Sequence, residues 1–276
     1  MSCDTSSAAI IETSQAGQQF DIDGPESKSS LNGTLPTYEE WLAEIDREVD
    51  DMKVDKVELL EKIMEGYERF NGSENTEILW RVARNLFRLG CLASAKGQKE
   101  EEKKYFMEAE KYIKKALDKD AEKPIHHAFA AYISGKLSYF VGQKERIQRG
   151  NEVYHHLEEA IRLGANDAGV YLAFGRLCIE VAKLTWIERK LASIIFSKPP
   201  EVTYQDALDK FTEADELEPD TKVIHFWMAK AHIAMKNYDK AIRALDTAAK
   251  CNPKREEDLT IEEELASLQE KYASYR

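Results

Sequence analysis

The stretch KVIHFWMAKAHIAMKNYDKAIRALDTAAKCNP, residues 222–253, contains the pattern that decides the fold. Ala229 stands where a first helix needs a small side chain, and Ala241, Leu245 and Ala248 share one face of a second helix. Small side chains let two helices approach closely, while larger ones fill the space between neighbouring pairs. Because Pro253 cannot continue a helix, the stretch predicts one complete helical hairpin.

The spacing of the second helix recurs three times upstream. It is found in Ala207, Phe211, Ala214 and Pro219, in Val153, Leu157 and Ala160, and in Ala109, Ile113 and Ala116. Hairpins that repeat about every 34 residues are typical of tetratricopeptide repeats. We therefore predict an all-α, tetratricopeptide-like helical-hairpin solenoid with elongated helices. Its expected units cover about 76–122, 124–166, 168–221 and 222–255.

The two ends of the chain differ from these units. Residues 1–35 are poor in large apolar side chains and acidic, which predicts a disordered segment before a helical domain over 36–276. Residues 1–60 contain 14 Asp and Glu against 4 Lys and Arg, so most of the net charge of −12 lies there. Capping patterns predict N-terminal helices over 37–70 that begin with a box from Thr37 to Glu40, and a helix start at Thr203 with Asp206 at the third position. They also predict a terminal helix over 260–274 that begins with a box from Thr260 to Glu263.

Several classes of function find no support in the sequence. There is no phosphate-binding glycine loop, no catalytic motif and no metal-ligand spacing around the pairs His126-His127 and His155-His156, so we expect no enzyme, no cofactor and no metal. The net charge disfavours nucleic acid. No apolar run is long enough for a transmembrane segment. Four scattered cysteines predict reduced thiols in a cytoplasmic protein.

A candidate partner-binding groove follows from the positions of basic residues on the predicted first helices. Convergent guanidinium groups suit carboxylate or phosphate, although the same residues can instead pair with glutamates on neighbouring helices. The acidic segment 1–35 is a further candidate occupant of this groove. The candidate groove residues are Arg81, Arg84, Asn85, Arg88, Arg176 and Lys230.

Two further stretches stand out. The stretch GQKERIQRG (142–150) forms a secondary basic cluster with Lys144, Arg146 and Arg149, although such a run is more often a solvated turn. The third unit contains about twenty surplus residues, which we expect to extend its first helix until Pro199-Pro200 stops it. In this inserted helix an apolar face would be buried or would line a lipid-sized cavity, with the basic residues in solvent. Its candidate residues are Trp186, Arg189, Lys190, Leu191, Ile194 and Ile195.

Three stretches together resemble a known family. LTWIERKLASIIFSKPPEVTYQDAL (184–208), EILWRVARNLF (77–87) and YFVGQKERIQRG (139–150) are similar to the regulator of microtubule dynamics family, over roughly residues 53–255. The family includes microtubule-associated spindle proteins. It also includes membrane-anchored members that tether mitochondria to the endoplasmic reticulum and bind phospholipid. Those members carry an N-terminal transmembrane segment, which this sequence does not show, so we favour the soluble branch.

The resemblance implies a non-enzymatic microtubule-associated protein that regulates microtubule dynamics. It would act in spindle assembly and chromosome segregation, at the cytoskeleton, spindle and spindle poles. Tubulin would be bound directly or through an adaptor. A phospholipid-binding module at membrane contacts and a peptide-binding scaffold without microtubule contact are the alternatives.

Overall fold

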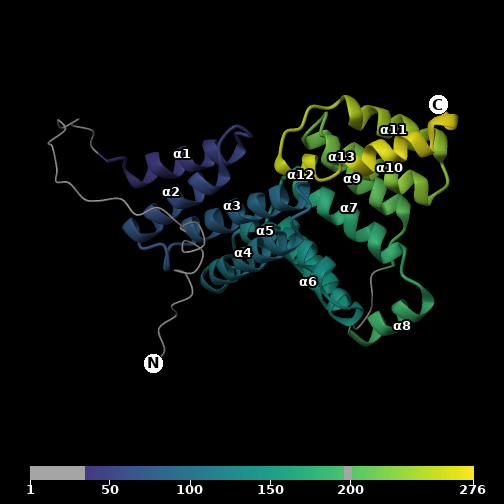
Figure 1. Cartoon of the computed structure of the whole chain (residues 1–276). Coiled ribbons are helices and arrows are strands. Elements are labelled where there is room, and N and C mark those ends of the chain that lie inside the picture. The colour runs from purple at the N-terminus through teal and green to yellow at the C-terminus, as the bar shows by residue number, and fades with distance from the viewer. Residues whose placement is uncertain (1–34, 196–200) are drawn as a thin grey trace. The chain divides into compact units, whose positions relative to one another are not determined.

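Helices account for the regular structure of the described part of the chain (Figure 1). The computed structural model describes residues 35–195 and 201–276, except for the side chain of Ile195. The expectation of disorder for residues 1–35 therefore falls almost entirely outside the described residues. No strand occurs within the described ranges, which confirms the all-α class. The elements are α1 (Tyr38–Asp50), α2 (Lys56–Arg69), α3 (Thr76–Ala95), α4 (Lys99–Lys119), α5 (Pro124–Leu137), η3 (Ser138–Phe140), α6 (Gln143–Arg162), α7 (Ala168–Ala182), α8 (Trp186–Ile195), α9 (Tyr204–Leu217), α10 (Lys222–Ala234), α11 (Tyr238–Lys250), α12 (Glu256–Leu259), α13 (Glu262–Lys271) and η4 (Ala273–Tyr275).

Four helical hairpins form the body of the unit Thr37–Arg276. They are α3 with α4, α5 with α6, α7 with α9, and α10 with α11. Two of them use the same close approach. An added Cβ on Gly90 would come within 2.4 Å of the Phe106 ring, and one on Gly175 within 2.4 Å of the Phe211 ring. Both phenylalanines are fully buried, so each glycine makes room for a ring from the second helix of its hairpin.

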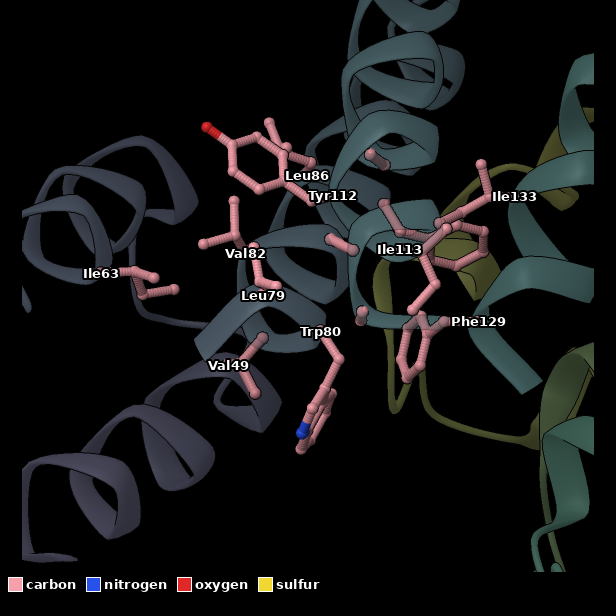
Figure 2. Packing of buried hydrophobic residues seen from close by; sticks show 14 of the residues in the cluster. Val49, Ile63, Leu79, Trp80, Val82, Leu86, Tyr112, Ile113, Phe129 and Ile133 are labelled. Atoms are coloured by element: carbon pink, nitrogen blue, oxygen red, sulfur yellow. The ribbon is translucent and has the colours of Figure 1, made fainter. Parts of the chain in front are cut away.

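The first hairpin also carries the N-terminal helices. Apolar side chains from α1 to α5 converge in one cluster, in which Val49, Ile63 and Leu79 lie close to one another (Figure 2). On the other side of α3, the Trp80 ring lies 6.0 Å from the Phe129 ring on α5. Because α1 and α2 bury their apolar faces here, they are part of the solenoid.

Two of the three expected capping boxes are present. Thr37 with Glu40 caps α1, and Thr203 with Asp206 caps α9, as the sequence predicts. The box predicted from Thr260 to Glu263 is wrong. The Thr260 hydroxyl instead donates to the Glu257 carbonyl, and α13 begins at Glu262 without a side-chain cap. The reason is a separate short helix, α12, which occupies the residues just before it.

The surplus of the third unit does not extend its first helix. Helix α7 ends at Ala182, and α8 begins as a separate helix at Trp186. Its apolar side chains are not buried as expected, because Trp186 is 74% exposed and Ile194 is 78% exposed. Leu191 is half-buried, and Ala192 is the side chain that packs inward. Pro199 and Pro200 lie outside the described residues.

Candidate functional site

A central cavity of about 550 Å³ lies between α3, α5, α6 and α7. Aromatic rings line one part of it, among them Trp80, Phe87 and Phe129. Cationic side chains line another part, and Lys254, Arg255 and Glu257 from the far end of the chain complete the wall. The cationic lining includes Arg84, Arg88, Lys136, Arg146, Arg176, Lys254 and Arg255.

The three predicted arginines of α3 face the acidic side of α1. Arg81 forms a bidentate pair with Asp46, at 2.6 and 3.0 Å, and also contacts Glu77. Arg84 reaches Asp50 at 2.6 Å. These guanidinium groups are also held against the Trp80 ring, with the Arg81 Cζ atom 4.3 Å from the ring centroid. The sequence correctly placed the arginines on one face, and α1 neutralises that face.

A second acidic element neutralises the remainder of the cavity cations. Glu257 on α12 lies 2.8 Å from the Lys136 Nζ atom and 2.7 Å from the Arg176 guanidinium. Glu256 lies 3.3 Å from Arg88 and 3.5 Å from the buried Lys56. Both carboxylates are removed from solvent, with residue exposures of 2% for Glu256 and 8% for Glu257.

The environment of Glu257 strongly favours its charged form. Burial by itself would raise the pKa of this carboxyl group, but the positive charges of Lys136 and Arg176 outweigh burial and hold the pKa below its usual range. The opposite effect acts on its neighbour, because burial raises the pKa of Asp258. Asp258 accepts hydrogen bonds from the backbone N–H groups of Val223, at 3.0 Å, and Lys254, at 2.8 Å.

The last two predicted groove residues also have partners within the chain. Asn85 is fully buried, and its amide donates to the Lys56 carbonyl oxygen at 2.8 Å, so it supports the packing of α2 on α3. Lys230 lies 2.8 Å from Glu264 on α13. The predicted groove cations therefore all take part in intramolecular ion pairs.

A different surface presents basic side chains without such partners. Gln143 at the start of α6 donates to Glu188 on α8 at 3.0 Å and joins the two helices. Beside this bond lie Lys144, Arg146 and Lys190, and no carboxylate of the described residues lies within 4 Å of them. Arg149, the third member of the predicted basic cluster, is different, because it pairs with Glu110 at 2.9 Å.

Large apolar side chains accompany these cations. Trp186, Ile187 and Ile194 are each at least 70% exposed, and the Lys190 ammonium lies 5.3 Å from the Trp186 ring centroid. Figure 1 shows α8 at the edge of the helical array, beside one end of α6. We call Lys144, Arg146, Trp186, Ile187, Arg189, Lys190 and Ile194 the α6–α8 surface. None of the described α8 residues lines the central cavity.

The described residues offer little to a metal ion. The ligand atoms of Asp220, His225 and Cys251 lie within 4.8 Å of one another. Burial raises the pKa of the Cys251 thiol, which favours its protonated form, and the His225 Nε2 atom already lies 3.3 Å from Asp215. We assign no metal to this group.

One histidine from each of the two adjacent pairs takes part in a contact that the sequence did not reveal. The Nδ1 atoms of His127 and His156 lie 3.0 Å apart, and the His127 Nε2 atom lies 2.9 Å from the Ala121 carbonyl oxygen. Burial, with the nearby His127, lowers the pKa of His156 to about 4. A neutral His156 can donate to His127, so this contact stabilises the α5–α6 hairpin.

Sequence reasoning missed α12 altogether. The signal was present in the run Arg255-Glu-Glu-Asp258, which lies between the end of the fourth unit and the terminal helix. Residues 256–259 belong to no predicted element, because a four-residue helix has no periodicity to recognise. The cationic partners of Glu256 and Glu257 lie 81 to 200 positions away in the sequence, as in the pairs of Arg176 with Glu257 and Lys56 with Glu256.

Comparison with known proteins gives the family. The family described as regulator of microtubule dynamics protein 1-3 matches residues 41–273. The chain belongs to the regulator of microtubule dynamics family. This confirms the resemblance carried by the three sequence stretches.

Family members differ from this chain in length. Regulator of microtubule dynamics protein 3 of Xenopus laevis is 34% identical over 71% of this chain and 43% of its own length. Regulator of microtubule dynamics protein 1 of Bos taurus is 31% identical over 75% of this chain and 65% of its own length. The chain thus spans less than two thirds of these relatives.

A solved structure supports the fold. A tetratricopeptide-repeat protein of Thermus thermophilus aligns with a TM-score of 0.52 over 80% of this chain and 90% of its own. Its sequence identity is 15%, so the likeness concerns the fold alone. The tetratricopeptide-like architecture predicted from residues 222–253 is confirmed.

Proposed function

We propose that this protein is a non-enzymatic, tetratricopeptide-like scaffold that regulates microtubule dynamics by binding the microtubule surface. The names of the family members support a role connected with microtubules. The finer proposal, cytoplasmic action at the spindle and its poles during chromosome segregation, rests on the resemblance to spindle proteins. Within the described residues, no helix combines the length and apolar character that a membrane crossing requires.

The exposed cations and apolar side chains of the α6–α8 surface support direct binding to microtubules. Tubulin tails are acidic, and a microtubule presents them in a regular array, so weak contacts add up through multivalency. Cations that already have carboxylate partners are largely neutralised and attract a further carboxylate less strongly. Lys144 and Lys190 have no such partner among the described residues, and exposed Trp186 and Ile187 add apolar area beside them.

Co-sedimentation with stabilised microtubules across a salt series tests this proposal. We expect the parent chain to pellet at low salt and to be released as salt rises, because screening weakens contacts between exposed charges. Lys144→Glu/Lys190→Glu should weaken binding at least tenfold. The matched control is Lys99→Glu/Lys104→Glu on α4, which makes the same charge change at other exposed lysines and should bind like the parent.

Three results would overturn the proposal in different ways. Absence of pelleting by the parent at low salt would exclude direct binding and favour an adaptor. Equal losses in both variants would show a dependence on net charge alone. Loss of binding in Arg81→Glu/Arg88→Glu with retention in Lys144→Glu/Lys190→Glu would move the contact to the central cavity.

A further inference from the structure

The route of the chain between α11 and α13 is longer than the packing of these two helices requires. They contact each other directly, with the Tyr238 and Tyr272 rings stacked at 5.2 Å and Gln269 donating to Asp246 at 2.8 Å. Residues 251–261 nevertheless leave α11, run to α3 and return (Figure 1). Helix α12 is the farthest point of this excursion.

The excursion delivers two consecutive glutamates to four cations. Glu256 meets Lys56 and Arg88, and Glu257 meets Lys136 and Arg176, so α2, α3, α5 and α7 each contribute one cation. A helix of four residues is not stable by itself, because nucleation costs more than so few hydrogen bonds return. Contacts with the rest of the chain therefore hold these residues in place, namely the ion pairs of Glu256 and Glu257 and the hydrogen bond from the Val223 N–H to Asp258.

Lys56, Lys136 and Arg176 have no other carboxylate partner among the described residues, whereas Arg88 also pairs with Asp50 at 3.2 Å. Arg88 and Lys136 also line the central cavity, and Arg176 is stacked over the Trp227 ring at 4.7 Å. Leaving buried cations unpaired costs several kcal/mol. The site is thus built for an acidic segment, and the space of about 550 Å³ beside it is open to the rest of a peptide.

We propose that the central cavity is a binding site for peptides with two consecutive glutamates, and that α12 is its built-in occupant. An external acidic peptide competes with Glu256 and Glu257 for the same cations, so α12 limits access to the site. Arg146 lies at the border between this site and the α6–α8 surface, but Glu256 and Glu257 do not pair with it, and the proposal does not depend on microtubule binding. Among the described residues, α12 and α1 supply the carboxylates that pair with the cavity cations Arg84, Arg88, Lys136 and Arg176.

A peptide with the sequence of the α12 region serves as the probe. A fluorescent peptide with the sequence of residues 252–262, NPKREEDLTIE, is titrated against the parent and against Glu256→Ala/Glu257→Ala, with fluorescence anisotropy as the readout. This variant keeps Asp258, which caps α10. We expect it to bind the peptide at least tenfold more tightly than the parent. A control peptide with glutamine in place of Glu256 and Glu257 should bind neither protein.

Circular dichroism shows whether the variant is folded. A folded variant that binds the acidic peptide no better than the parent does would overturn the proposal. If the variant fails to fold, hydrogen exchange of the parent protein tests the proposal instead. Excess acidic peptide should then speed exchange of the amides of 255–260, while the glutamine peptide should not. Unchanged exchange would also overturn the proposal. Neither measurement contains microtubules. A negative result for the acidic peptide therefore does not affect the proposed microtubule binding, and a negative result for microtubule binding does not affect the peptide proposal.

Discussion

The central cavity and the α6–α8 surface are made from the same kinds of residue. Each combines lysine and arginine with a tryptophan, and each was a candidate binding site from the sequence. In the cavity, Arg88 and Arg176 pair with carboxylates from distant parts of the chain, and Trp80 is 8% exposed. On the α6–α8 surface, Lys190 has no carboxylate partner among the described residues, and Trp186 is 74% exposed.

This difference separates residues that stabilise the fold from residues that are free to bind. A cation in a buried intramolecular pair contributes to stability, and its charge is largely neutralised before a partner arrives. An exposed cation contributes little to stability and is available at once. The three predictions below test the contrast, from the largest expected effect to the smallest.

Substitutions of the two tryptophans should differ most in their effect on the free energy of unfolding. Trp80→Ala removes a ring that packs against Phe129 and Arg81, and should lower the free energy of unfolding by about 3–5 kcal/mol. Trp186→Ala should change it by less than about 0.5 kcal/mol, because the ring is exposed. Urea unfolding of both variants measures the contrast. Similar losses would mean that α8 is packed against the body in solution.

Glu257→Gln tests the buried ion pairs. It leaves Lys136 and Arg176 without a negative partner and should cost about 3 kcal/mol at pH 7, the lower end for a broken buried pair. The folded-state pKa of Glu257 is lowered, so the stability that it contributes is present above its usual pKa of 4.5 and is lost as pH falls through the folded-state pKa.

The difference between this variant and the parent should therefore shrink as the pH is lowered below about 4.5. Chemical denaturation at several pH values measures this trend. The matched control is Glu263→Gln on α13, where the side chain is exposed, and it should show little change at any pH. A constant difference from pH 7 to pH 3 would contradict the assigned role of the Glu257 charge.

The smallest effect is expected at the α6–α8 surface. Lys144→Glu/Lys190→Glu should change the free energy of unfolding by less than about 0.5 kcal/mol, since exposed charges contribute little to stability. Thermal unfolding followed by circular dichroism is sufficient. If the variant lost more than about 1 kcal/mol, its effect on microtubule binding could not be assigned to the surface charge.

Local sequence patterns predicted much of the fold. The alanines of residues 222–253 predicted the hairpin of α10 and α11, and Thr37 and Thr203 predicted two helix starts. Each of these signals acts within one or two turns of helix, where the spacing of side chains is fixed by the backbone. The error at α8 arose because an amphipathic pattern indicates a helix without showing whether another element covers its apolar face.

The sequence by itself determined the helical class, the hairpin repeat and the family. It also placed Arg81, Arg84 and Arg88 on one side of a helix. Only the tertiary structure decided which charges are neutralised, because Asp46, Asp50 and Glu257 reach the cations from other elements. Helical periodicity is a local property of the chain, whereas ion pairing and burial depend on which segments fold against each other. That physical difference explains why the basic residues could be found in the sequence, but not which of them are free to bind a partner.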